Sequence, residues 1–148
     1  MKTRMKNWMI ALVCVFTVST AAYADNDKPI AVSQLPAAAQ QTLKKYFGSQ
    51  KVAMAKMESG LLEKTYDVIF TNGEKIEFNR KGEWTEISCK STTVPAALIP
   101  SAISKYIKAN YPDAKVLSIE RDKECEVQLN NRIELTFDKS YQLIDIDM

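Results

Sequence analysis

The sequence predicts an α+β fold: two tandem repeats, each one helix followed by a four-stranded antiparallel meander, forming one large sheet with helices on one face. Two observations support this fold class. The chain resembles itself when it is shifted by about 60 residues, and in each copy the apolar spacing changes once from helical to alternating. The 148 residues are 46% apolar with only four glycines, which is typical of a globular protein.

The internal match aligns corresponding segments in the same order. Residues 35–38 fall on 99–102, 66–68 on 125–127, 76–79 on 135–138, and 86–87 on 145–146. We therefore expect a first helix-plus-sheet repeat over residues 25–93 and a second over residues 94–148. Because units of this size bury little core alone, the two repeats should pack into one compact body.

Two helices are expected, over residues 34–47 and 96–111, where apolar residues recur at helical spacing. Ser33 is a plausible N-cap of the first helix, with Pro36 in its first turn. Gly48 follows the last apolar residue of this helix and should end it.

Alternation of apolar and polar residues predicts eight strands. They are expected at residues 52–57, 65–71, 74–79, 84–88, 116–121, 124–130, 133–138 and 143–147. Asn72-Gly73 is a strong signal for a hairpin turn. The alternation assigns these apolar residues to the helix side: Val68, Phe70, Ile76, Phe78, Ile87, Val127, Leu129, Ile133, Leu135, Phe137, Ile144 and Ile146.

The N-terminus has the pattern of a secretory signal peptide over residues 1–24. Basic residues precede an apolar run at 8–18, and Ala22-Tyr23-Ala24 resembles a cleavage site. The apolar run is too short to span a bilayer comfortably. We expect cleavage after Ala24, no membrane span in the mature chain, and a periplasmic or secreted protein.

Composition excludes several functions. Removing the three basic residues of the leader leaves 17 Lys and Arg against 18 Asp and Glu, so no basic surface for nucleic acid is expected. The chain has no His, which removes Ser-His-Asp and Cys-His catalysis and His-ligated metals. Nothing predicts the deep pocket that a carboxylate pair would need for glycoside hydrolysis. We expect no enzyme.

Short structural motifs resemble those of the PepSY-like family of exported bacterial proteins, which share a beta-lactamase-inhibitor-protein-like fold. They are Leu35-Pro36, Val94-Pro95-Ala96-Ala97, Tyr66-Asp67-Val68, Asn72-Gly73, and the stretch from Ile76 to Trp84 that includes Gly82. The second repeat departs from them at Cys125, Arg132 and Tyr141. The resemblance implies a non-enzymatic periplasmic module that binds, inhibits or regulates another protein through its exposed sheet face, and a calcium response in some members.

The residues expected to bind a partner lie on the strand face opposite the helices. They are Trp84, Ile69, Lys75, Glu77, Glu86 and Leu143. An exposed Trp beside apolar neighbours is typical of a docking patch. The alternative is that Trp84 packs across the sheet against a neighbouring strand. The partner would be an unidentified exported or periplasmic protein.

A second hypothesis is a calcium-responsive periplasmic binding protein. The acids expected to hold the metal are Glu126, Glu134, Asp138, Asp145 and Asp147. Calcium takes six to eight oxygen ligands, often from several carboxylates. The EF-hand spacing is absent, and the same acids could form only a solvated sheet face. No other cofactor is expected.

Two cysteines remain after cleavage, Cys89 and Cys125. An even count in an exported protein suggests a disulfide. If the strands follow chain order, however, one strand separates the two cysteines, which favours two buried free thiols. The Val116 strand and the C-terminal strand could be sheet edges, so either a monomer or a weak dimer is expected.

Overall fold

The computed structural model describes residues 27–148, which form one antiparallel sheet and two short α-helices. The helices are α2 (Ala37–Tyr46) and α3 (Ser101–Asn110), each preceded by a 3-10 turn, η2 (Val32–Gln34) or η3 (Ala96–Leu98). The strands are β1 (Asp27–Ile30), β2 (Val52–Ser59), β3 (Lys64–Phe70), β4 (Lys75–Phe78), β5 (Trp84–Ser88), β6 (Val116–Arg121), β7 (Cys125–Leu129), β8 (Glu134–Phe137) and β9 (Leu143–Asp147).

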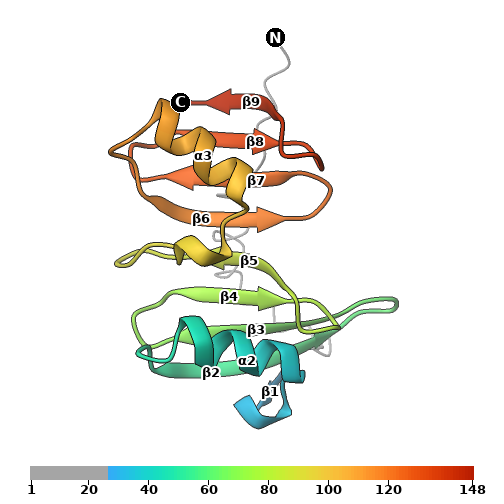
Figure 1. Cartoon of the computed structure of the whole chain (residues 1–148). Coiled ribbons are helices and arrows are strands. Elements are labelled where there is room, and N and C mark those ends of the chain that lie inside the picture. Colours follow the sequence, from blue (N-terminus) through green and yellow to red (C-terminus); the bar gives the residue numbers. More distant parts are fainter. Residues whose placement is uncertain (1–26) are drawn as a thin grey trace, which may run out of the picture.

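The nine strands lie in the sheet in the same order as in the chain, from β1 at one edge to β9 at the other. Figure 1 shows α2 and α3 on the same face of this sheet. Every neighbouring pair is antiparallel, including β5 and β6, where Glu86 lies opposite Glu120 and Ser88 opposite Ser118. The sheet is therefore continuous across its middle.

This architecture corrects the predicted fold class. The described chain is mostly one nine-stranded antiparallel sheet with two short helices, not two repeats of a helix and a four-stranded meander. Strand β1 precedes the first helix and pairs with β2. Its four residues are too few to show alternation. Pro29, which lacks a backbone N–H, is compatible with an edge strand.

Both helices begin later than predicted. Pro36 and Pro100 are the N-cap residues of α2 and α3, and neither helix has a side-chain cap. A proline disfavours the helical conformation at the residue before it, and both Leu35 and Ile99 are extended. Ser33, predicted to cap the first helix, lies instead in η2.

The core lies between the helices and one face of the sheet. Helix residues Ala39, Leu43, Ile103 and Ile107 are buried there. The strand residues buried with them include Val68, Phe70, Ile76, Phe78, Ile87, Val127, Leu129, Leu135 and Phe137, and Ile133 packs partly against them. All of these were predicted on the helix side.

The two isoleucines of β9, also predicted on the helix side, are not buried in the core. Ile144 is 51% exposed and Ile146 is 39% exposed. Ile144 lies in an irregularity of the β8–β9 pairing, between residues opposite Phe137 and Thr136. Ile146 lies opposite Leu135, but on the outermost strand, where a neighbour covers one side only.

Both cysteines are buried free thiols. Cys89 follows β5 and Cys125 begins β7, so β6 separates them. Burial raises the pKa of Cys125 to about 11, which keeps this thiol protonated and unreactive. Strand β6 is interior, so the prediction that the Val116 strand forms an edge was wrong, whereas β9 is an edge.

The predicted signal peptide, residues 1–24, lies outside the described residues. Within residues 27–148, neither helix has the length and apolar character required to cross a bilayer.

Candidate functional site: the open face of the sheet

The face of the sheet opposite α2 and α3, here called the open face, carries mostly charged and polar side chains. One row crosses the sheet from strand to strand through direct register partners. It runs Lys56, Asp67, Glu77, Glu86, Glu120, Glu126, Thr136 and Asp145. Side chains directly opposite on an antiparallel pair interact, so this row determines the electrostatics of the face.

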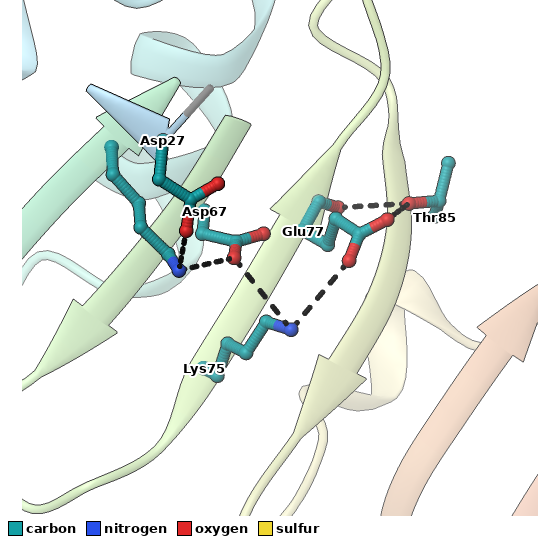
Figure 2. Close-up of polar contacts among 6 residues, drawn as sticks. Asp27, Asp67, Lys75, Glu77 and Thr85 are labelled. Carbon is teal, nitrogen blue, oxygen red and sulfur yellow. Dashed lines mark hydrogen bonds and ion pairs between the residues drawn. The ribbon is translucent and has the colours of Figure 1, made fainter. Parts of the chain in front are cut away.

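At the β1–β4 end of the row, lysines neutralise the acids (Figure 2). Lys56 Nζ lies 2.8 Å from Asp27 Oδ2 and 3.6 Å from Asp67 Oδ2. Lys75 Nζ lies 3.8 Å from Asp67 Oδ2 and 3.5 Å from Glu77 Oε2. The hydrogen bond to Asp27 is the main reason why the pKa of Lys56 is raised. Burial acts to lower the pKa of Lys75, but the surrounding carboxylates raise it overall.

Towards the middle of the sheet the row contains acids in succession. Glu86, Glu120 and Glu126 lie directly opposite one another on β5, β6 and β7. Burial, followed by repulsion from Glu86 and Glu126, raises the pKa of Glu120. Burial also raises the pKa of Glu77, against the opposing effect of Lys75. In the part of the chain from 27 to 148, no ion pair neutralises Glu86 or Glu120.

A cleft of about 610 Å³ opens where this acidic stretch meets the ends of the strands. Its lining includes Glu77, Thr85, Glu86 and Glu120. Thr85 also donates a hydrogen bond of 3.4 Å to the Glu77 carboxylate (Figure 2). Three hairpins contribute the remaining sides: residues 62–65 of the β2–β3 hairpin, residues 79–80 of the β4–β5 hairpin, and residues 121–123 of the β6–β7 hairpin.

The β2–β3 hairpin extends beyond the rest of the sheet (Figure 1). Its tip carries Leu61 and Leu62, whose exposed fractions are 105% and 95%. Two adjacent leucines without apolar contacts contribute nothing to the core, so they are available to a partner.

The predicted exposure of Trp84 was wrong, because Trp84 is 7% exposed. The β4–β5 pairing shifts between Glu77 and Phe78, so Thr85 and Glu86 both face Glu77. This β-bulge places Trp84 opposite Phe78, on the helix side. Trp84 therefore packs against a neighbouring strand, as in the alternative given for it in the sequence analysis.

Arg121 covers the Trp84 ring. Its guanidinium carbon lies 3.5 Å from the ring centroid, and Nη2 donates a 2.6 Å hydrogen bond to the Trp84 carbonyl oxygen. Leu143 is displaced in the same way as Trp84, because a shift in the β8–β9 pairing places it opposite Phe137. It packs partly against the core.

The other residues predicted to bind a partner do lie on the open face. Ile69 is half-buried between Met54 of β2 and Lys75 of β4. Glu77 and Glu86 face each other across β4 and β5. A role in binding stays a prediction for each of them, and for Trp84 and Leu143.

The acids predicted to bind calcium do not form one cluster. Glu134 lies opposite Asp147, while Glu126 and Asp145 lie on either side of Thr136. The Asp138 carboxylate accepts hydrogen bonds from the backbone of Ser140 and Gln142 in the β8–β9 turn. Among residues 27–148, no three His, Cys, Asp or Glu side chains are grouped closely enough to hold a metal. Calcium binding stays a prediction.

Sequence reasoning missed three features of this face: Lys56, Glu120 and the cleft. Glu120 acquires its acidic neighbours only through the β5–β6 and β6–β7 pairings, which local alternation does not specify. The charge pattern Lys56, Asp67, Lys75 was visible, but its meaning depends on the same cross-strand register.

A buried carboxylate outside the open face was also missed. Glu74 is 2% exposed and accepts hydrogen bonds from the backbone N–H groups of Lys90, Ser91 and Thr92, at 2.7–3.0 Å. The Thr92 hydroxyl also donates to it, at 2.7 Å. Burial favours the protonated acid, but these hydrogen bonds lower the pKa of Glu74 to about 2. Glu74 therefore fixes the loop that leaves β5.

Comparison with known proteins identifies relatives of this chain. Residues 64–145 match the family model described as "Putative beta-lactamase-inhibitor-like, PepSY-like". No curated protein matches the chain.

Solved structures from Bacteroides are similar over most of the chain. A "putative periplasmic protein" of the DUF2874 family from Bacteroides vulgatus is 57% identical, with a TM-score of 0.82, and the match covers 84% of this chain and 99% of the relative. A "putative calcium-regulated periplasmic protein" from Bacteroides thetaiotaomicron is 61% identical, with a TM-score of 0.81 and the same coverage. A second Bacteroides vulgatus protein "of unknown function" is 42% identical, with a TM-score of 0.77 over 82% of this chain and 99% of its own.

Proposed function

The chain belongs to the PepSY-like, beta-lactamase-inhibitor-like family, and from this membership we propose that it is a periplasmic, non-enzymatic module that binds, and thereby inhibits or regulates, another exported protein through the open face. One observation carries the proposal: the sheet is covered by helices on one face only, within residues 27–148. The other face presents the charged row and the cleft to solvent.

Electrostatics support binding rather than catalysis. The raised pKa of Glu120 resembles the tuning of a general acid. However, the cleft contains no His, and no Cys lines it. Salt-bridged and half-buried charges on a broad sheet face suit recognition of a complementary surface, where they determine specificity and association rate.

Site-specific photo-cross-linking in the native cell tests this proposal. A photoreactive residue is placed at Ile69 or Gln128 on the open face, and at Lys108 on exposed α3 as the control. We expect one discrete cross-linked product from the open-face positions and none from position 108. Products of equal yield from both faces, or products from position 108 alone, would contradict the proposal.

The second candidate function is calcium-responsive binding by the acids of β7–β9. Two observations favour it: the name of the Bacteroides thetaiotaomicron relative, and the direct opposition of Glu134 and Asp147 across β8 and β9. Two carboxylates at directly opposed positions can both supply oxygen ligands to a divalent cation.

Thermal unfolding after chelation, with and without calcium, tests this candidate. Ligand at 100 times its dissociation constant stabilises a protein by about 2.7 kcal/mol, which corresponds to a rise of several degrees. The double variant Asp145→Asn, Asp147→Asn should lose the shift, while Glu58→Gln keeps it. An equal shift with magnesium, or in the double variant, would eliminate this site.

A further inference from the structure

We propose that the cleft takes an arginine or lysine side chain of the protein partner, while Leu61 and Leu62 contact apolar surface beside that side chain. This inference rests on the proposed function and specifies the chemistry of the partner. It combines two features at the same end of the open face. The acidic floor of the cleft is formed by Glu86 and Glu120, and the apolar tip of the β2–β3 hairpin is formed by Leu61 and Leu62.

The floor carries two carboxylates, Glu86 and Glu120, that form no ion pair within residues 27–148. Glu120 is half-buried and lies directly opposite Glu86 on one side and Glu126 on the other. Like charges directly opposite are destabilising in a sheet. A partner cation placed over Glu86 and Glu120 would remove this repulsion and form charge-assisted hydrogen bonds.

Cations at the cleft do not fulfil that role. Arg121 is stacked on Trp84 and donates to its carbonyl oxygen. Arg80 and Lys123 line the cleft as exposed residues, and Lys64 lines it as a half-buried residue. Across residues 27–148, none of these cations lies within ion-pair distance of Glu86 or Glu120.

The leucine tip gives the second contact. Leu62 lines the cleft, and Leu61 precedes it at the end of the hairpin. Arginine is enriched at interface hot spots, and the contacts that surround such a residue exclude water from it. The charged residues that flank the tip are Glu58, Glu63 and Lys64, and this excess of acid favours a protein with a basic group over an anionic lipid surface.

A metal ion is the competing occupant of the floor. In the described part of the chain, the acids are not grouped closely enough to ligate one. A guanidinium or ammonium group needs fewer ligands, since two carboxylates are sufficient to pair with it.

An NMR titration of the isotope-labelled protein with short peptides tests the inference. The probes are acetyl-Leu-Arg-Leu-amide and its citrulline analogue, which keeps the shape but lacks the charge. We expect the arginine peptide to shift the amide signals of Thr85, Glu120 and Lys123, and to bind at least about tenfold more tightly than the citrulline peptide. Equal affinities, or no shifts from the arginine peptide at about 10 mM, would overturn the inference.

Matched variants separate the two contacts. Glu86→Gln with Glu120→Gln should abolish arginine-peptide binding, whereas Asp145→Asn, on the same face but outside the cleft, should retain it. Leu61→Ser with Leu62→Ser should weaken the leucine-flanked peptide but not acetyl-arginine-amide. If calcium at millimolar concentration displaces the arginine peptide and itself shifts the same signals, the cleft is a metal site and the inference fails.

Failure of this inference can be distinguished from failure of the proposed function. A cross-link from Gln128 that persists in the Glu86→Gln, Glu120→Gln protein would keep the open face as the docking surface but overturn the role of the cleft. If no open-face position gives a cross-link in the protein that keeps Glu86 and Glu120, the proposed function itself is contradicted.

Discussion

The β2–β5 and β6–β9 regions have the same order of strands but differ in charge on the open face. In the first region Lys56 lies opposite Asp67, and Lys75 opposite Ile69. At the corresponding places in the second region, Glu120 lies opposite Glu126, and Glu134 opposite Gln128. Lys56 and Lys75 of the first region thus correspond to Glu120 and Glu134 of the second region. In the first region Asp67 and Glu77 form ion pairs with lysines, whereas Glu86 and Glu120, in the middle of the sheet, form none within residues 27–148.

The largest expected difference between the two regions concerns Trp84 and Leu143, which occupy corresponding positions after a shift in strand pairing. Trp84→Ala should destabilise the protein by about 3–5 kcal/mol, because it removes a buried ring and the stacking surface of Arg121. Leu143→Ala, at a half-buried edge position, should cost about 1–2 kcal/mol. Urea unfolding measures both, and equal losses would contradict the assigned burial.

The next effect concerns Glu74, for which the second region has Ile133 at the corresponding position. Glu74→Gln should destabilise the protein by about 2–3 kcal/mol, because three backbone donors lose an ionised acceptor. Since the pKa of Glu74 is lowered to about 2 from the model-peptide value of 4.5, its contribution is fully present above pH 4.5 and is lost as the pH falls towards 2. The exposed control Glu63→Gln should show neither change. If the difference in free energy of unfolding between the wild type and Glu74→Gln did not change at acidic pH, the lowered pKa assigned to Glu74 would be wrong.

The turn residues give a smaller contrast. Gly82 has φ +82°, and a Cβ added there would lie 2.8 Å from Pro36 Cβ and 2.9 Å from Ala39 N. Gly82→Ala should therefore cost about 2 kcal/mol or more, from both left-handed strain and the clash with α2. Tyr141, in the β8–β9 turn, already has φ 60°, so Tyr141→Gly should change stability by less than about 1 kcal/mol. Thermal unfolding compares the two, and a harmless Gly82→Ala would show that this turn is not packed on α2.

The smallest effect tests the charge difference directly. Glu120→Gln should stabilise the protein by about 0.5 kcal/mol, because it removes a glutamate that lies between two others. Lys75→Met should destabilise it by a similar or larger amount, because Asp67 and Glu77 lose their shared cation. The gain from Glu120→Gln should disappear below pH 4, where the carboxyl with the raised pKa is already protonated. If Lys75→Met instead stabilised the protein, the ion pairs of the first region would not be stabilising, and the proposed difference between the two regions would be wrong.

Alternation in the sequence was sufficient to locate most strands, and β5, β6 and β9 have the predicted bounds. It failed where two residues oppose one, because a bulge depends on the pairing of strands and not on either strand alone. Trp84 and Leu143 were assigned to the wrong face for this reason. The partners of Glu74 lie 16–18 residues away in an irregular loop, so no local pattern could reveal them. The acidic floor could not be predicted without the register between β5 and β6, where the two regions meet, because this pairing places Glu86 opposite Glu120.

The agreement between strand order and chain order has a kinetic consequence. Most pairings in the sheet join strands that are connected by a short turn, and only β1–β2 and β5–β6 have a helix between them. Loop-closure costs are therefore small, and low contact order favours fast folding. Either region can form its hairpins before the other is available. We therefore expect the β5–β6 ladder to close last, so variants at Ser88 or Ser118 should accelerate unfolding while leaving the folding rate nearly unchanged.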